Sequence, residues 1–258
     1  ARIAREHGAV VFERFNAELV GKGYALNWLL QRMDAEYPDR PFDAYLVFDA
    51  DNVLEPDYIE QINRTFSDGY EVVTSYRNSK NFGDNWISSG YALWFMRESA
   101  WLNRPRMRLG TSCAISGTGF GFTRKVLDEC GGWNFFLLTE DIQFTVDNVV
   151  NGRRIGYCAE AMLYDEQPTK FKQSWNQRKR WARGYAQVVG EYGNDMIKSI
   201  LSGSFAAYDM CMSILPAAIA SMVGILVNVA GLVVTILTRQ DTMTIVWSAL
   251  GLLNCLYF

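Results

Sequence analysis

The chain has 258 residues, of which 49% are hydrophobic and 14% aromatic, enough to build the core of one large domain or two ordinary ones. The formal net charge of -3 argues against a protein that coats nucleic acid, because nonspecific binding to phosphate backbones needs a broad cationic surface. Five cysteines without a Cys-x-x-Cys pair argue against a disulfide framework or a zinc site. With a single histidine in the sequence, proton transfer is left to carboxylates, lysine or tyrosine.

The first third of the chain alternates predicted strands and helices. In chain order these elements are a strand at 8–12, a helix at 22–37, a strand at 45–48, a helix between Pro56 and Gly69, and a strand at 71–76. The strand at 45–48 is continuously apolar, which is typical of strands buried on both faces. Strand, helix and strand in succession indicate an α/β fold.

The middle of the chain continues this alternation and then changes character. The expected elements are a helix at 84–102, a strand at 113–122 broken by three glycines, a helix at 139–150 capped by Thr139, and short strands at 154–157 and 161–164. From Ser174 onward, aromatic and apolar residues recur at helical spacing with arginine and lysine between them. That pattern predicts an amphipathic helix suited to the headgroup region of a membrane.

The last part of the chain is apolar. No charged side chain occurs at 210–238, and an apolar helix of roughly 20 residues already crosses a bilayer. We therefore expect one transmembrane segment there, followed by a polar turn at 239–241 and a second apolar run at 242–258. Cations precede the first segment, which predicts that the domain before it faces the cytoplasm.

Two groups of acidic residues are candidates for chemistry. Asp49 and Asp51 follow the apolar strand at 45–48, at the edge where open α/β sheets place their ligands. They are either part of a strand-end turn or hard oxygen ligands that hold Mg²⁺ or Mn²⁺ against a diphosphate. Glu140 and Asp141 follow Thr139 at a helix start, where the helix dipole favours acids even without a function.

A cationic stretch at 178–183 is equally ambiguous in isolation. Its arginines and lysine could meet anionic lipid beside a membrane, each contributing about 1 kcal/mol near the surface. Trp175 and Trp181 could then serve as interfacial anchors. Taken alone, this stretch identifies no site.

The order of the motifs is more informative than any one of them. Along the chain they are Lys22-Gly23-x-Ala25-Leu26-Asn27, Asp49-x-Asp51, Ser116-Gly117-Thr118, Thr139-Glu140-Asp141 and Gln177-x-x-Arg180-Trp181. This series resembles the family 2 inverting glycosyltransferases of the processive, membrane-embedded kind, such as cellulose, hyaluronan and poly-N-acetylglucosamine synthases. The resemblance covers nearly the whole chain, and the combination of its last two motifs is specific.

The resemblance implies an architecture. It is a partial GT-A catalytic domain at 1–172, with a Rossmann-like α/β sheet, followed by interfacial amphipathic helices at 173–208 and a transmembrane region at 209–258. A multi-pass protein of the cell membrane with a cytoplasmic catalytic domain is expected. The first strands of the family's fold have no counterpart before Ala1, so we expect a fragment truncated at both ends, with little transferase activity of its own.

The resemblance also implies roles for individual residues. Asp141 would be the general base, with Glu140 beside it. The residues implied to bind the donor are Lys22, Asp49, Asp51, Gln177 and Arg180, and the two aspartates among them would also hold Mg²⁺ or Mn²⁺. Those implied to bind the acceptor are Trp181, whose indole would stack under a sugar, and Ser116, Gly117 and Thr118.

The expected function is transfer of a sugar, with inversion, from a nucleotide diphosphate donor to a growing polysaccharide, and a UDP-sugar is the first candidate donor. A carboxylate within hydrogen-bond reach accelerates attack by an acceptor hydroxyl by roughly 10²–10⁴, which suits Asp141. The alternatives are transfer of one sugar to a lipid acceptor and a catalytically silent membrane scaffold that retains the fold. The expected partners are the donor, a polysaccharide or glycolipid acceptor and membrane lipids, without nucleic acid.

Overall fold

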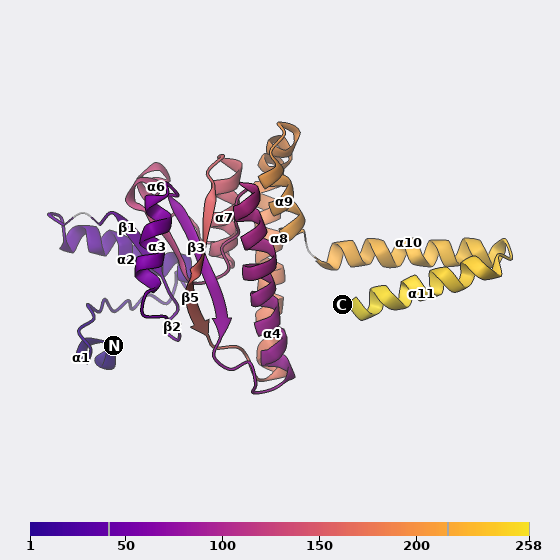
Figure 1. The fold of residues 1–258 in the computed structure, drawn as a ribbon, viewed down its shortest axis with the longest axis horizontal. Helices are drawn as coiled ribbons and strands as arrows, with labels where there is room; N and C mark the ends of the chain where they lie inside the picture. The colour runs from indigo at the N-terminus through magenta and orange to yellow at the C-terminus, as the bar shows by residue number, and fades with distance from the viewer. Residues whose placement is uncertain (41, 216, 258) are drawn as a thin grey trace. The chain divides into compact units, whose positions relative to one another are not determined.

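The computed structural model describes residues 1–40, 42–215 and 217–257. The side chains of 217–222 and 252–257 are outside this description. The chain divides into two compact units, Ala1–Met210 and Cys211–Phe258, drawn in Figure 1. The first unit contains the sheet and all five sequence motifs.

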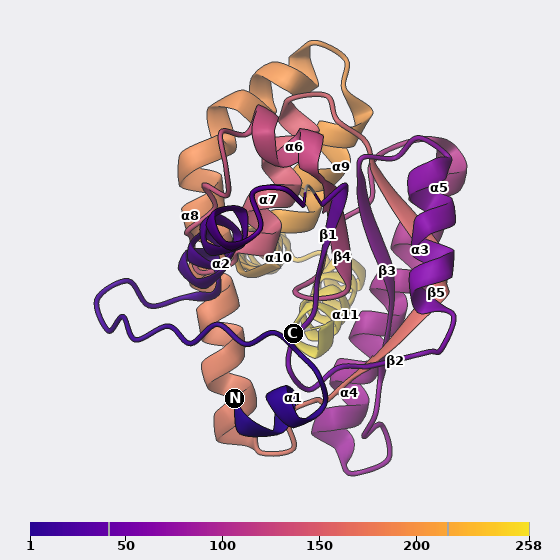
Figure 2. The same ribbon diagram turned by 90° about the vertical axis from the view of Figure 1, so that its left-hand side faces the viewer.

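The first unit is built on one mixed sheet of five strands. The strands are β1 (Ala44–Val47), β2 (Val53–Leu54), β3 (Val72–Ser79), β4 (Phe120–Thr123) and β5 (Ile155–Asp165), in the spatial order β1-β4-β3-β5-β2. The pair β3 and β5 is parallel, whereas the other three pairs are antiparallel. Helices cover both sides of these strands (Figure 2), so the predicted α/β class is confirmed.

Two apolar clusters lie on opposite faces of the sheet. The larger one gathers Phe120, Phe122 and Trp133 with residues of the helices α2 (Lys22–Glu36), α6 (Arg124–Glu129) and α7 (Glu140–Val150). The smaller one lies beneath α3 (Tyr58–Ser67). Strand β1 places Tyr45 on the first cluster and Leu46 on the second, which confirms that this strand has two packed faces.

The remaining helices of this unit follow the sheet's outer connections. They are α1 (Arg2–Glu6), α4 (Trp86–Met96), the π-helical segment η1 (Arg97–Asn103), α5 (Arg104–Leu109), α8 (Phe171–Leu201) and the first part of α9 (Phe205–Ile214), which the boundary between the units divides. The helices predicted at 22–37, after Pro56, at 139–150 and from Ser174 are confirmed within a few residues. The one predicted at 84–102 is confirmed too, but its second half is π-helical, a geometry often found at functional sites.

Two strand predictions are wrong and a third needs correction. Residues 8–12 pair with no strand, and the chain there is largely exposed. Of the strand expected at 113–122, only the end forms β4, because Gly117 and Gly119 adopt φ values of +77° and +67°, outside the extended region. The two strands expected at 154–157 and 161–164 are one strand, β5, whose register against β3 shifts opposite Ser75 and Tyr76 as at a β-bulge.

The expected cap of α7 differs in detail. Thr139 is the N-cap residue, but its side chain makes no capping hydrogen bond. Its hydroxyl is buried without a partner among the described residues, and it lies against Gly184 of α8, where an added Cβ would come within 2.5 Å of the threonine side chain. The threonine therefore serves as a packing contact between α7 and α8.

The second unit is a pair of helices, α10 (Ala217–Leu237) and α11 (Asp241–Tyr257), which pack together with Gly231 against Trp247. Within the described ranges, no helix of the chain is both long enough and apolar enough to cross a membrane. The transmembrane segments expected at 210–238 and 242–258 are therefore not supported. Residues 216 and 258 of those two runs lie outside the described residues.

Gly23 allows α2 to lie close to the backbone at Phe135 and Phe136. A Cβ at this position would lie 2.0 Å from the carbonyl oxygen of Phe135. We expect Gly23→Ala to lower the free energy of unfolding by about 1–3 kcal/mol, even though alanine favours helix by about 1 kcal/mol. Urea denaturation measures the effect.

Gly190, in the exposed part of α8, is the matched control, since a Cβ there meets nothing within 4 Å. Gly190→Ala should leave the stability unchanged or raise it by about 0.5–1 kcal/mol. Equal effects of the two substitutions would refute the close contact at Gly23.

Candidate active site

The site begins where α2 meets the end of β1. The ammonium group of Lys22 lies 2.6 Å from Oδ1 of Asp49 and donates to the carbonyl oxygen of Gly117 at 2.7 Å. Lys22 is the first residue of α2, and the contact of Gly23 with the Phe135 backbone brings it to this place. One cation thus joins three segments that are far apart in the sequence.

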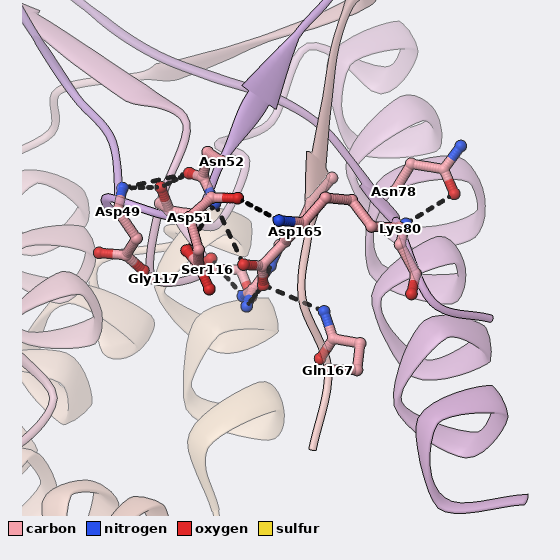
Figure 3. A network of polar contacts seen from close by, with 12 residues as sticks. Asp49, Asp51, Asn52, Asn78, Lys80, Ser116, Gly117, Asp165 and Gln167 are labelled. Carbon is pink, nitrogen blue, oxygen red and sulfur yellow. Dashed lines mark hydrogen bonds and ion pairs between the residues drawn. The ribbon is translucent and has the colours of Figure 1, made fainter. Parts of the chain in front are cut away.

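A polar network holds the loop after β1 in place (Figure 3). The backbone N–H of Asp49 donates to the hydroxyl of Thr118 at 2.9 Å and to Oδ1 of Asn52 at 3.1 Å. The amide group of Asn52 donates in turn to Oδ1 of Asp165, the last residue of β5, at 3.1 Å. Thr118 was expected to bind the acceptor. Its hydroxyl is buried, accepts from the Asp49 N–H and donates to Oδ1 of Asn52.

The centre of that network is a buried ion pair between Arg77 and Asp165. The guanidinium Nε donates to Oδ2 of Asp165 at 2.9 Å, and Nη1 donates to the carbonyl oxygen of Ser116 at 2.9 Å. The same guanidinium lies 3.5 Å from the centre of the Phe95 ring. Arg77 thus links β3, β5 and α4 with the glycine-rich loop at 116–119.

Asp141, at the start of α7, faces the same glycine-rich loop. Its Oδ2 accepts a hydrogen bond from the backbone N–H of Gly117 at 2.6 Å. It lines a cavity of about 100 Å³ together with Asp49, Gly117, Glu98, Arg180 and Trp181. A second hollow of about 230 Å³, lined by Lys22 and Glu140, shares Asp49, Asp141 and Arg180 with the first. Carboxylates from the loop after β1 and from α7 thus line the same hollows.

Burial changes the acid–base behaviour of these carboxyl groups. Desolvation raises the pKa of Asp141, while hydrogen bonds from backbone N–H groups and the charge of Lys22 oppose the rise. Desolvation and the neighbouring Asp141 charge raise the pKa of Glu140 to about 7. A carboxyl group whose pKa is moved toward neutrality is suited to accepting and releasing a proton at physiological pH.

The N-terminal half of α8 forms one wall of the cavity. The indole of Trp181 packs edge-on against the rings of Tyr91 and Phe95 at centroid distances of 5.8 and 6.2 Å. Trp181 therefore lies in the cavity wall, and interfacial anchoring is the wrong interpretation for this residue. Oε1 of Gln177, also in the wall, is buried without a partner among the described residues, which leaves an acceptor available to a ligand.

Asp51, like Thr118, is a predicted site residue that lines neither hollow. Its side chain is exposed, its Oδ1 accepts from Asn52 at 3.4 Å, and its carbonyl oxygen accepts from Lys80 at 2.6 Å. Of the described residues, no three or more His, Cys, Asp or Glu side chains converge as a metal cluster would. The carboxylates of Asp49 and Asp51 are hard oxygen ligands that solvent can reach. They fit Mg²⁺ or Mn²⁺, which take their other ligands from substrate phosphates and water.

Three site residues were missed by the sequence analysis. Arg77 and Asp165 carry no motif, and Glu98 stands alone as an acid within an aromatic helix. The carboxylate of Glu98 accepts from the hydroxyl of Ser116 at 2.6 Å, and burial raises its pKa. A single acid in a helix rich in aromatic residues is the one signal that could have singled it out, because acids are seldom buried without a partner.

The raised pKa of Glu140 predicts a pH-dependent stability. Between the ordinary value of 4.5 and about 7 the folded protein holds a proton that the unfolded chain has released, so stability present at low pH is lost as the pH rises through this window. Glu140→Gln cannot ionise, and we expect it to raise the free energy of unfolding at pH 8 by up to about 3 kcal/mol, with little effect at pH 4.5. Urea denaturation at the two pH values tests this.

Glu160, which is exposed on β5, provides the control substitution. Glu160→Gln should change stability little at either pH. A stabilisation by Glu140→Gln that is the same at both pH values would contradict the raised pKa.

Comparisons with known proteins agree with this geometry. The family model described as "Glycosyltransferase like family 2" matches residues 1–184. A beta-monoglucosyldiacylglycerol synthase of Trichormus variabilis is 27% identical over 217 residues, which cover 83% of this chain and 44% of that protein. A poly-beta-1,6-N-acetyl-D-glucosamine synthase of Staphylococcus aureus is 31% identical over 88 residues, covering 34% of this chain and 21% of the relative.

Among solved structures, a mannosyltransferase from Pyrobaculum calidifontis, in complex with GDP-Man and Mn²⁺, has a TM-score of 0.47 and 16% identity, covering 94% of this chain and 68% of that one. The sheet is of α/β type, and the match over 1–184 places the chain in a class of glycosyltransferases. The chain belongs to glycosyltransferase family 2. It spans less than half the length of the first curated relatives it matches.

Proposed function

We propose that the chain carries the catalytic site of an inverting β-glycosyltransferase that uses a nucleotide diphosphate sugar, with Asp141 as the general base. The observation that supports this most directly is the position of Asp141 in a cavity wall, next to Asp49, Arg180 and Trp181. A carboxylate suits activation of the acceptor hydroxyl, a cation suits the leaving diphosphate, and an aromatic face suits the apolar side of a sugar.

Asp141 would take the proton of the acceptor hydroxyl as its oxygen attacks the anomeric carbon. In the same displacement the bond from that carbon to the diphosphate oxygen breaks, and the configuration inverts. The hydrogen bond from the Gly117 N–H fixes the position of this carboxylate at the loop. A positioned carboxylate of raised pKa contributes roughly 10²–10⁴ to such a step.

Lys22 and Arg180 would stabilise the charge that develops on the leaving diphosphate. Both lie around the hollow that also contains Asp141, and fixed cations at developing charge are a strong catalytic device. Gln177, whose buried Oε1 has no partner within the described part of the chain, would contact the donor from the same helix as Arg180. Trp181 would seat the apolar face of the acceptor sugar.

Asp49 and Asp51 would hold Mg²⁺ or Mn²⁺. When bound, such an ion neutralises part of the diphosphate charge. In the structure Lys22 already pairs with Asp49, and this pair provides one positive charge at the same carboxylate.

Two acceptors are candidates. The Gln177-x-x-Arg180-Trp181 motif favours a growing polysaccharide. The relatives matched over most of this chain favour a lipid, since their printed names are those of glucosyldiacylglycerol synthases. For either acceptor, we propose that the site works at the cytoplasmic face of the cell membrane.

The test is transfer by the full-length protein from a panel of UDP-sugars, with diacylglycerol and with oligosaccharide as acceptors, followed by measurement of product length. A ladder of products supports polymer synthesis, and a single glycolipid supports lipid glycosylation. Chelation of divalent ions should abolish either activity. A protein that neither binds UDP nor hydrolyses any donor would instead be the catalytically silent scaffold.

A further inference from the structure

The continuous helix formed by α4, η1 and α5 has an outward side that no described segment of the first unit covers with apolar contacts. Trp86, Trp94 and Trp101 are 75%, 50% and 73% exposed on it. Three exposed indoles on one helix are unusual, because soluble surfaces rarely leave large aromatic residues in contiguous contact with water. Here "the outer face" denotes these tryptophans with three arginines: Trp86, Trp94, Arg97, Trp101, Arg104 and Arg108.

The spacing of these residues places them on one side. Successive members are separated by eight, three, four, three and four residues, and all six are exposed, including Arg97 and Trp101 of the π-helical segment. An apolar groove of about 730 Å³ runs along the C-terminal half, lined by Met96, Trp101, Pro105 and Leu109. The outer face therefore includes a groove that can hold acyl or aromatic groups.

The charges on this side are all positive. Arg97, Arg104 and Arg108 are exposed, and none of them forms an ion pair with a described residue. Between Asn85 and Leu109 the sequence contains one acid, Glu98, whose carboxylate points to Ser116 and the cavity instead. Arg97 lies over the ring of Trp94 at 5.5 Å, so cations and indoles alternate closely.

We propose that the outer face docks on an anionic lipid surface. Indoles that sit at the headgroup level and arginines that meet lipid phosphates are the two features that bind amphipathic helices to membranes. The net charge of -3 would repel the chain from such a surface as a whole, so a local cationic patch has to supply the attraction.

The same helix connects this surface to the cavity. Its inward side presents Phe95 to Trp181 and Glu98 to Ser116. Trp94, at one edge of the outer face, also lines the cavity of about 100 Å³, so docking through the outer face would bring the headgroups beside that cavity. The docking itself depends only on the surface residues and not on any reaction.

The test is co-sedimentation of the whole chain with vesicles of phosphatidylcholine alone or mixed with phosphatidylglycerol. The wild-type chain should bind the anionic vesicles more tightly. Arg104→Gln with Arg108→Gln should reduce that affinity by about tenfold to thirtyfold, and Trp101→Ser should weaken binding to both kinds of vesicle. These residues are exposed, so the variants should keep the wild-type melting temperature.

Two comparison variants make the result specific. Arg32→Gln with Arg64→Gln removes the same charge from cations on α2 and α3 that are paired with Glu36 and Glu60, and it should not weaken binding. Trp175→Ser with Lys179→Gln alters the exposed side of α8. If only this α8 variant loses binding, or if the outer-face variants retain the full preference for anionic vesicles, the proposal is overturned.

Discussion

Asp141→Asn is expected to reduce sugar transfer by about 10²–10⁴ while donor binding persists, because asparagine cannot accept the proton of the acceptor hydroxyl. The amide oxygen can still accept the hydrogen bond that Gly117 donates at 2.6 Å, so the loop should keep its shape. The measurement is the steady-state rate of transfer by the full-length protein, alongside UDP binding by calorimetry. Because burial raises the pKa of Asp141, the wild-type rate should fall on acidification above the range of an ordinary aspartate.

Asp147→Asn is the control for this experiment. Asp147 lies on the same helix, α7, and contributes to neither of the two hollows at the site. The Asp147→Asn variant should retain the wild-type rate of transfer. Transfer by Asp141→Asn at the wild-type rate would remove Asp141 from the role of base, and loss of UDP binding together with transfer would point to a collapsed site.

Arg77→Met is expected to destabilise the protein by about 3–5 kcal/mol, because it leaves the Asp165 carboxylate buried without its cation. The side chains of this pair are 11% and 5% exposed, and the carboxylate is further bound by Asn52 and Gln167. Urea denaturation at pH 7 measures the loss. The double variant Arg77→Met with Asp165→Asn should recover part of it, since no charge is then stranded.

An exposed ion pair supplies the comparison. Arg64 and Glu60 on α3 are 65% and 63% exposed, so Arg64→Met should cost only about 0–1 kcal/mol. If the double variant at Arg77 and Asp165 proves less stable than Arg77→Met alone, the lost free energy comes from packing and not from an unpaired charge.

Sequence patterns were sufficient for the elements whose residues carry local signals. The helix that begins at Lys22 and the strand that precedes Asp49 follow from periodicity and from proline and glycine positions. The helix at Glu140 follows from its acidic first turn. These three elements position Lys22, Asp49 and Asp141, which is why the motif order could bring them together.

What the sequence analysis lacked was long-range pairing. A strand expected at 113–122 is mostly a loop, because glycines with positive φ aim Gly117 at both Lys22 and Asp141. The pair of Arg77 and Asp165 has a separation of 88 residues, and no local pattern encodes such a contact. Asp51 shows the opposite failure, since its motif is clear but its side chain is exposed outside both hollows.

Gly117 has a consequence for how this site can change. Its carbonyl oxygen accepts a hydrogen bond from the Lys22 ammonium at 2.7 Å, and its own N–H donates one to Oδ2 of Asp141 at 2.6 Å. While both hydrogen bonds are made, the spacing between cation and carboxylate is set by the covalent length of one amino acid. A related sequence that uses a different sugar would have to change other residues that line the hollow, while the spacing set by Gly117 stays the same.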